Sequence, residues 1–171
     1  GLIDVMEMIR TIGRRIGREH EGKSLVTQLE SGLDAVSRRV AGKPRPRTLL
    51  VFAREPAALR GIYASGGAGF LHDMLTIAGG DNVFGSIEGE RVSQVSSEAI
   101  LTAAPDVVIE IRNEGLFDPD SLAMERVVWQ RFSTVPAVRS NRVYFLSGSE
   151  FVVPGPRVLE AVEQLAKLLH P

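Results

Sequence analysis

A helix that leads directly into a buried strand, residues 96–111, constrains the fold of this chain more than any other stretch. Ser96 is a residue type that caps helix N-termini, and the small and apolar residues after it predict a helix that Pro105 ends. Val107 to Ile111 is then almost continuously β-branched, which is typical of a strand covered on both faces. Strands of this kind belong to parallel sheets, so the unit indicates an α/β fold.

Alternating strands and helices continue this pattern from residue 47 to the end of the chain. Further strands are expected at 48–53, 82–84 and 143–146, and helices at 70–78, from 119 to about 132, and from 156 to 169. Residues 54–65 are expected to form a long loop that ends in a glycine-rich turn. The alternation predicts a three-layer, Rossmann-like α/β domain with a mainly parallel sheet and helices on both sides.

Two helices are expected before residue 47. The first, residues 2–16, has apolar residues at three- and four-residue steps, and we interpret it as a packed helix rather than a membrane-surface helix because Asp4 and Glu7 dilute its basic charge. Residues 17–22 are expected to break the pattern. A long second helix with a narrow apolar stripe then runs from about Lys23 to Ala41, and a Gly/Pro linker ends it.

Composition excludes several classes of function. The 171 residues are 44% hydrophobic with a net charge of −1, which suits a domain with its own core and shows no nucleic-acid footprint. There are no cysteines, and the three histidines lie far apart in sequence. No apolar run is long enough to span a membrane, and the start lacks the apolar core of a signal peptide. We therefore predict no catalytic residues, no metal ligands and no resident cofactor.

Ligands of parallel α/β sheets bind outside the carboxyl ends of the strands, which directs attention to four predicted loops. These are residues 54–63, 86–91, 112–117 and 147–153, and they carry aromatic rings and guanidinium groups that could hold a large planar or anionic ligand. The predicted ligand-binding residues are Arg54, Tyr63, Arg91, Arg112, Phe117 and Phe151.

A nucleotide-binding enzyme domain is the alternative interpretation. Gly67 and Gly69 supply the first two glycines of a dinucleotide-binding fingerprint after a strand and before a helix, but His72 stands where the third glycine belongs. The long loop before the turn also departs from the tight connection that the fingerprint requires. A glycine turn that lets two backbone segments pack closely is the simpler explanation.

Several segments, in the same order along the chain, resemble one protein family. They are AGGDNVF at 78–84, QVSSE at 94–98, PDVVI at 105–109, Trp129, VPAV at 135–138, NRVY at 141–144, PGPR at 154–157 and LHP at 169–171. In these segments the chain resembles the helical-backbone substrate-binding proteins of bacterial ABC importers, which carry cobalamin, iron-siderophores or haem.

The resemblance implies a division of the chain. Members of the family have two α/β lobes joined by one long helix, with the ligand between the lobes. By this resemblance residues 1–18 are the last helix of an amino-terminal lobe that is otherwise missing, residues 19–43 the interdomain helix, and residues 44–171 the carboxy-terminal lobe. The protein would then be periplasmic or lipid-anchored at the cell surface, and apolar faces exposed by the missing lobe would favour self-association.

The resemblance also implies partners and one docking residue. The ligand would be cobalamin or a ferric siderophore, with haem as a third candidate, and the ABC permease in the membrane would receive it. In the family each lobe presents an acid near a helix start that contacts the permease, and Glu98 matches the acid of the carboxy-terminal lobe. From physical chemistry alone, an acid in the first turn of a helix interacts favourably with the helix dipole.

Overall fold

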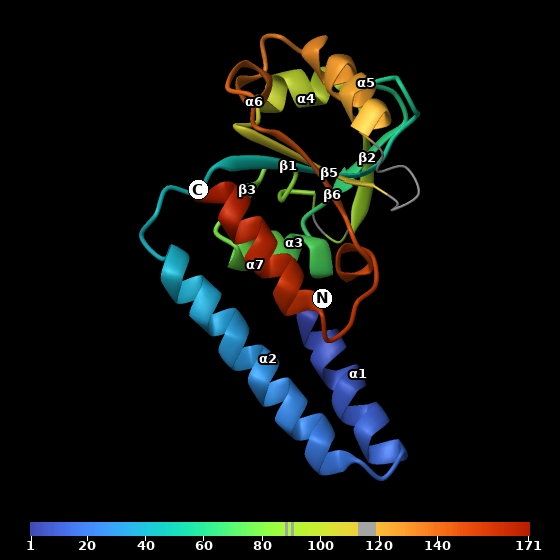
Figure 1. Ribbon diagram of the computed structural model, residues 1–171, viewed down its shortest axis with the longest axis vertical. Helices are drawn as coiled ribbons and strands as arrows, with labels where there is room; N and C mark the ends of the chain where they lie inside the picture. Colours follow the sequence, from blue (N-terminus) through green and yellow to red (C-terminus); the bar gives the residue numbers. More distant parts are fainter. Residues whose placement is uncertain (88, 90, 113–118) are drawn as a thin grey trace. The chain divides into compact units, whose positions relative to one another are not determined.

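The computed structural model describes residues 1–87, 89, 91–112 and 119–171, which divide into two compact units. Unit 1 comprises residues 1–45, 69–80 and 149–171, and unit 2 comprises residues 46–68 and 81–148. Unit 1 is helical, and unit 2 contains the whole sheet (Figure 1). None of the helices in the described part of the chain has the length and apolarity to cross a membrane.

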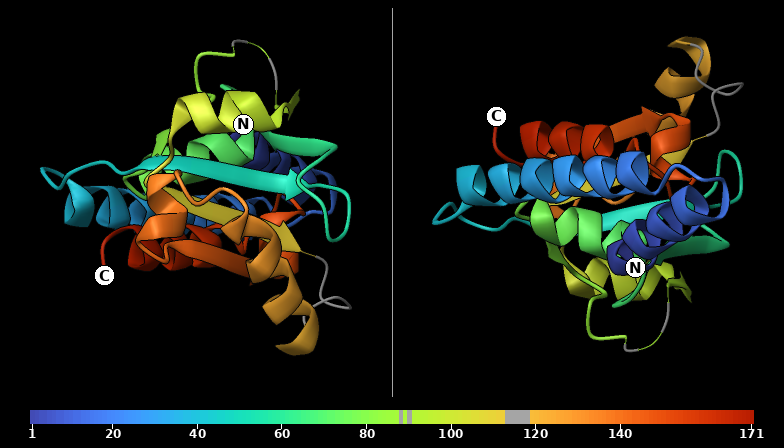
Figure 2. Two further views of the ribbon diagram at one scale, coloured as in Figure 1. Left: turned by 90° about the horizontal axis from the view of Figure 1, so that it is seen from above. Right: turned by 90° about the horizontal axis from the view of Figure 1, so that it is seen from below.

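Unit 1 contains four helices: α1 (Leu2–Arg15), α2 (Glu19–Val40), α3 (Phe70–Ile77) and α7 (Val158–Leu169), together with the 3₁₀ helix η2 (Ser149–Phe151). Helices α1 and α2 form a hairpin, and α7 runs alongside α2 (Figure 2). The expected break at residues 17–22 is shorter in the structure, because α2 already begins at Glu19 and Gly22 lies inside it. Gly22 lets the two backbones approach closely, since a Cβ at Gly13 would lie 3.2 Å from the Gly22 Cα.

The exposed side chains of α1 match the expectation of an apolar surface. Ile3, Met8 and Ile12 of α1 and Ile16 directly after it are exposed, whereas Leu2, Val5, Met6 and Ile9 are buried. The helix is therefore apolar on more than the face that unit 1 buries. Self-association through this surface stays a prediction, and light scattering of the chain at high concentration would measure it.

The sheet of unit 2 confirms the α/β class and the mainly parallel arrangement. Its strands are β1 (Arg47–Ala53), β2 (Ile62–Ser65), β3 (Asp81–Asn82), β4 (Val92–Val95), β5 (Val107–Arg112) and β6 (Val143–Ser147). Their order is β4-β2-β1-β5-β6, with β3 also pairing β1. The pairs β1–β3, β1–β5 and β5–β6 are parallel, whereas β2 is antiparallel to both β1 and β4.

The sequence did not predict β4, and two further expectations about the first half of this sheet differ from the structure. Residues 62–65, expected in a long loop, form β2, because Gly61 at φ 57° turns the chain back so that it pairs with β1. The expected strand at 82–84 is only the short β3, because the side chain of Asn82 accepts a hydrogen bond from the Phe84 N–H at 3.1 Å and turns the chain.

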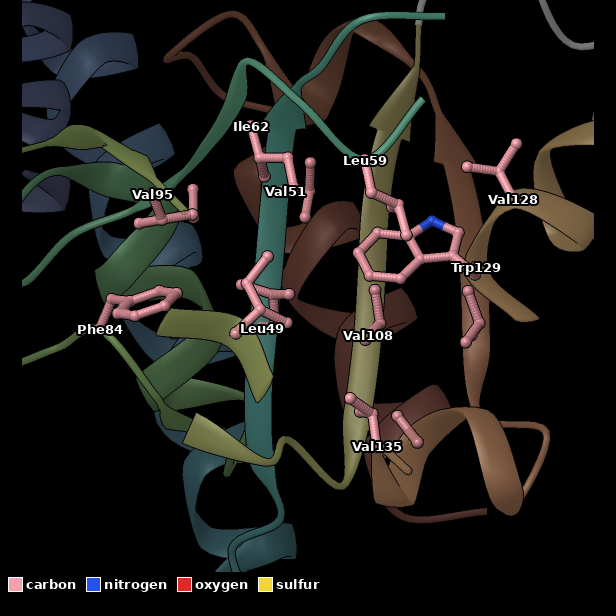
Figure 3. Packing of buried hydrophobic residues seen from close by; sticks show 14 of the residues in the cluster. Leu49, Val51, Leu59, Ile62, Phe84, Val95, Val108, Val128, Trp129 and Val135 are labelled. Atoms are coloured by element: carbon pink, nitrogen blue, oxygen red, sulfur yellow. The ribbon is translucent and has the colours of Figure 1, made fainter. Parts of the chain in front are cut away.

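One face of the sheet carries the core of unit 2. Helices α4 (Ser97–Ala103), α5 (Pro119–Gln130) and α6 (Pro136–Arg139) lie on this face (Figure 1). Trp129 of α5 is the largest fully buried side chain and lies near Leu59 and Val108, while Val135 lies toward the opposite end of the same core (Figure 3). Helix α4 begins as predicted, since the Ser96 hydroxyl accepts a hydrogen bond from the Ala99 N–H at 3.0 Å.

Candidate functional site

The strands of unit 2 bring several loops to one edge of the sheet. Strands β1, β4, β5 and β6 all end at this edge, which we call the carboxyl edge, and β2 begins there because it runs in the opposite direction. In open α/β sheets this is the edge at which ligands bind. Arg54, Tyr63 and Arg112, three of the predicted ligand-binding residues, lie at it.

Arg54 and Arg112 come together in a buried cluster with Glu110 of β5 and Glu125 of α5. Arg54 donates from Nε to Glu110 at 3.0 Å and from Nη2 to Glu125. Arg112 donates from Nη1 to Glu110 at 2.7 Å and from Nη2 to Glu125 at 3.3 Å. These four residues, with two positive and two negative charges, form what we call the four-charge cluster.

The four-charge cluster is almost entirely removed from water. The side chain of Arg54 is 1% exposed and that of Glu110 3%. Trp129 completes the cluster. Its Nε1 donates to Glu110 at 2.8 Å, and its ring centroid lies 5.8 Å from the Arg54 guanidinium carbon. Burying four charges is tolerated because they are balanced and hydrogen-bonded.

The charges of the cluster shift the pKa of Glu125. Burial raises the pKa of its carboxyl group, but the hydrogen bond from Arg54 and the positive charges of Arg54 and Arg112 outweigh burial and hold the pKa below its usual value of 4.5. Glu125 is therefore negatively charged at neutral pH, as the charge balance of the cluster requires.

Tyr63 lies on β2 at the carboxyl edge, and the structure places a second exposed aromatic residue near it. Tyr63 pairs with Ala53, and the register between β1 and β2 shifts at this point, so that Phe52 sits in an irregularity of the ladder. Phe52 is 39% exposed and Tyr63 42%. Irregularities of this kind often re-aim a side chain next to a binding site.

Phe52 was not among the sequence-based predictions, because it reads as one more apolar residue of a buried strand. The only signal for it was its position near the end of that strand.

Glu98 lies in the first turn of α4, where it is exposed. Strand β4 ends one residue before the capping Ser96, so Glu98 also belongs to the carboxyl edge. The position gives the acid a favourable interaction with the helix dipole and leaves its carboxylate accessible to a partner.

The remaining predicted ligand-binding residues are dispersed. Arg91 is exposed just before β4, at the opposite end of that strand from the carboxyl edge. Phe151 belongs to η2 in unit 1 and is buried, 1% exposed. Phe117 lies outside the described residues. The ligand-binding role of all six residues stays a prediction, and the burial of Arg54 and Phe151 favours a structural role for these two.

The glycine-rich turn is occupied by backbone contacts. The N–H of Gly67 donates to the carbonyl of Ile87 at 3.0 Å, and the N–H of Gly66 donates to the carbonyl of Arg91 at 3.2 Å. A Cβ at Gly67 would lie 2.2 Å from the carbonyl oxygen of Gly85. Amides that are already bonded cannot cradle a phosphate, so the turn favours close backbone packing over nucleotide binding.

Besides Phe52, sequence reasoning missed three residues of the site, Glu110, Glu125 and Trp129. Glu110 did give a signal, because it interrupts the apolar run from Val107 to Ile111, and a charge in a buried strand needs a partner. Its partners could not be read from the sequence. Among the described residues no group of His, Cys, Asp or Glu could hold a metal ion.

Comparison with known proteins agrees with this architecture. Residues 4–149 match the family described as periplasmic binding protein. The chain is 27% identical over 168 residues to the uncharacterized ABC transporter substrate-binding lipoprotein YvrC of Bacillus subtilis, with 98% of this chain and 50% of YvrC covered. It is 30% identical over 137 residues to the vitamin B12-binding protein of Salmonella choleraesuis, with 79% of this chain and 44% of that protein covered.

A solved structure supports the same assignment. The chain superposes on the ABC-type Fe3+-hydroxamate transport system protein of Saccharomonospora viridis with a TM-score of 0.84 and 26% identity, over 99% of this chain and 56% of that one. The chain spans about half the length of the curated relatives it matches. From its mainly parallel sheet and from a family match that extends over most of its length, we conclude that the chain belongs to the periplasmic binding protein family.

Proposed function

We propose that this chain is part of the substrate-binding component of an ABC importer, which captures cobalamin or a ferric siderophore and delivers it unaltered to the membrane permease. Haem is the third candidate ligand. The protein would act in the periplasm or, lipid-anchored, at the outer surface of the cell. It would be a binding protein rather than an enzyme, as the names of the relatives indicate for those proteins.

The observation that supports this function best is the carboxyl edge of the sheet. It presents two exposed aromatic side chains, Phe52 and Tyr63, and it also carries Arg54 and Arg112 of the four-charge cluster. Aromatic faces suit large ligands such as a corrin or a ferric chelate, because they bury much area at little cost in side-chain entropy. The names of two relatives, a vitamin B12-binding protein and an Fe3+-hydroxamate transport protein, point to the same chemistry.

The proposed function requires a second lobe. We propose that residues 44–171 form one lobe, that residues 19–43 form the helix that joins the lobes, and that residues 1–18 belong to the other lobe. Support comes from the length of α2, which continues without interruption from Glu19 to Val40, and from relatives about twice as long as this chain.

Calorimetry on the full-length gene product that contains this chain tests the ligand. Cyanocobalamin, a ferric hydroxamate and haem should be titrated separately, and saturable one-to-one binding of at least one is expected. Calorimetry is preferred to tryptophan fluorescence, because Trp129, the one tryptophan of this chain, is a buried residue of α5 and would report on a ligand only indirectly. Absence of binding by all three ligands would contradict the proposal.

Glu98 is proposed as the acid that contacts the permease. Glu98→Gln should leave the Kd for the ligand unchanged and strongly reduce uptake by cells that depend on this importer. Asp120→Asn is the matched control, because Asp120 is also an exposed acid in the first turn of a helix. Equal uptake by the two variants would exclude Glu98 from the docking surface.

A further inference from the structure

The chain reverses direction between β1 and β2 in a compact turn, residues 55–61, at the carboxyl edge. Two internal hydrogen bonds define the turn: the Glu55 N–H donates to the Arg60 carbonyl at 3.0 Å, and the Ala58 N–H donates to the Glu55 carbonyl at 3.3 Å. Ala57 adopts φ 53°, in the left-handed region that residues with a side chain rarely occupy. Such a conformation persists only where the surroundings enforce it, and it is frequent at ligand-binding sites.

The four-charge cluster supplies that enforcement. Besides its two carboxylate partners, Arg54 donates from Nη1 to the carbonyls of Glu55 at 3.2 Å and Ala58 at 3.0 Å, on either side of Ala57. Glu125 accepts a hydrogen bond from the Ala57 N–H at 3.5 Å. One buried guanidinium therefore binds both acids of the cluster and two backbone carbonyls of the turn.

The other end of the turn is fixed at the start of α4. The Ser97 hydroxyl donates to the Leu59 carbonyl at 2.7 Å, and the Leu59 side chain is buried in the core of unit 2. The turn is thus attached on one side to the four-charge cluster and on the other to the helix that carries Glu98. Only its outer residues, among them Glu55, Pro56 and Arg60, are exposed.

We propose that Arg54 is a positioning residue, which holds the turn at residues 55–61 in one conformation so that the carboxyl edge is preorganised for its ligand. This inference rests on the proposed function, and it gives Arg54 a role behind the site in place of direct ligand contact. Stability alone does not explain why four charges are buried here, since apolar side chains of similar volume often stabilise a core at least as well. A preorganised loop, by contrast, increases affinity because less order is lost on binding.

The decisive variant is Arg54→Lys. Lysine retains the charge but lacks the planar fork, so it cannot reach both carboxylates and both carbonyls at once. In the full-length gene product we expect the Kd for the ligand to rise about tenfold, as for the loss of a hydrogen bond to a charged group. Arg60→Lys is the matched control, because Arg60 belongs to the same turn but its side chain is 78% exposed.

A second control separates positioning from stability. Val135→Ala removes buried side-chain volume near the end of the core opposite Leu59 and Trp129 (Figure 3), and it should lower the unfolding midpoint without changing the Kd. Wild-type affinity in Arg54→Lys, or an equal loss of affinity in Val135→Ala, would overturn the inference.

Amide hydrogen exchange separates this inference from the proposed function. The N–H groups of Glu55 and Ala58 should exchange faster in Arg54→Lys than in Arg60→Lys, while the amides of β5 stay protected in both variants. If the wild type bound none of the three ligands, the proposed function would fail, and this exchange experiment would still decide whether Arg54 holds the turn. Equal exchange in the two variants would refute the positioning role.

Discussion

Among the described residues, the ion pairs of unit 1 lie at the surface, whereas unit 2 contains buried ion pairs besides an exposed one between Arg60 and Glu55. In unit 1 the pairs lie on the surface, and the side chains of Arg10 and Glu30 are 44% and 50% exposed. In unit 2 the Arg54–Glu110 pair is 1% and 3% exposed. An exposed pair contributes about 0–1 kcal/mol, whereas breaking a buried pair costs about 3–5 kcal/mol because a charge is left without its partner.

The comparison separates what holds each unit together. Unit 1 depends on apolar stripes and on the close approach of α1 and α2 at Gly13 and Gly22, and its ion pairs are exposed. In unit 2, removing one charge of the four-charge cluster would leave a buried partner without its counter-charge. The cluster lies at the edge where a ligand is expected. Buried charges that also bind the backbone of a turn are better explained by positioning than by stability.

The largest effect is expected for Glu110→Gln. The substitution leaves two buried guanidinium groups facing the single carboxylate of Glu125, and the free energy of unfolding should fall by about 3–5 kcal/mol. Urea denaturation followed by circular dichroism measures it. Glu30→Gln, which breaks an exposed pair of unit 1, should change the free energy by less than about 0.5 kcal/mol. Similar losses in the two variants would remove the distinction between the units.

A smaller loss is expected for Gly13→Ala in unit 1. The new Cβ would lie 2.9 Å from the Arg18 carbonyl oxygen and 3.2 Å from the Gly22 Cα, so the helix hairpin must open. Overpacking costs about 1–3 kcal/mol, and the better helix propensity of alanine returns about 1 kcal/mol. A net loss of about 1 kcal/mol is therefore expected in urea denaturation. Ser31→Ala, at an exposed position of α2, is the control, and a stabilised Gly13→Ala would show that the close approach is unnecessary.

Acid should destabilise unit 2 through Glu125. The pKa of Glu125 is lowered by the hydrogen bond and charge of Arg54 against the opposing effect of burial, so the unfolded chain takes up a proton at this group more readily than the folded chain. The stability that Glu125 contributes is therefore present above about pH 4.5 and is lost as the pH falls through the lower pKa of the folded state. Urea midpoints measured from pH 6 to pH 3 should fall more steeply for the wild type than for Glu125→Gln, and parallel curves would contradict this linkage.

How far the sequence predicts this molecule depends on the range of the contacts involved. Local chemistry was sufficient for the capped helix at Ser96 and for the strand that begins at Val107, and both are confirmed. Strand β2 was missed because its four residues become a strand only by pairing with β1 and β4, and that pairing cannot be read from so short a segment.

The four-charge cluster was missed for the same reason. Arg54 and Arg112 were selected as ligand contacts, but Arg54 meets partners that lie 56 and 71 positions further along the chain. Nothing local to either arginine shows that it will be buried. The apolar surroundings of Glu110 were the single sequence signal, and they indicate that a partner is needed without identifying it.

The smallest effect is expected for the pair between Arg39 of α2 and Glu163 of α7, whose Nη2 and Oε2 atoms lie 2.6 Å apart. Its side chains are 50% and 35% exposed, so water and salt screen the attraction. A double-mutant cycle with Arg39→Ala and Glu163→Ala should give a coupling free energy of about 0.2–1 kcal/mol that shrinks in high salt. A coupling as large as the loss expected for Glu110→Gln would mean that exposure does not set the strength of ion pairs in this chain. The contrast between the units would then need another physical cause.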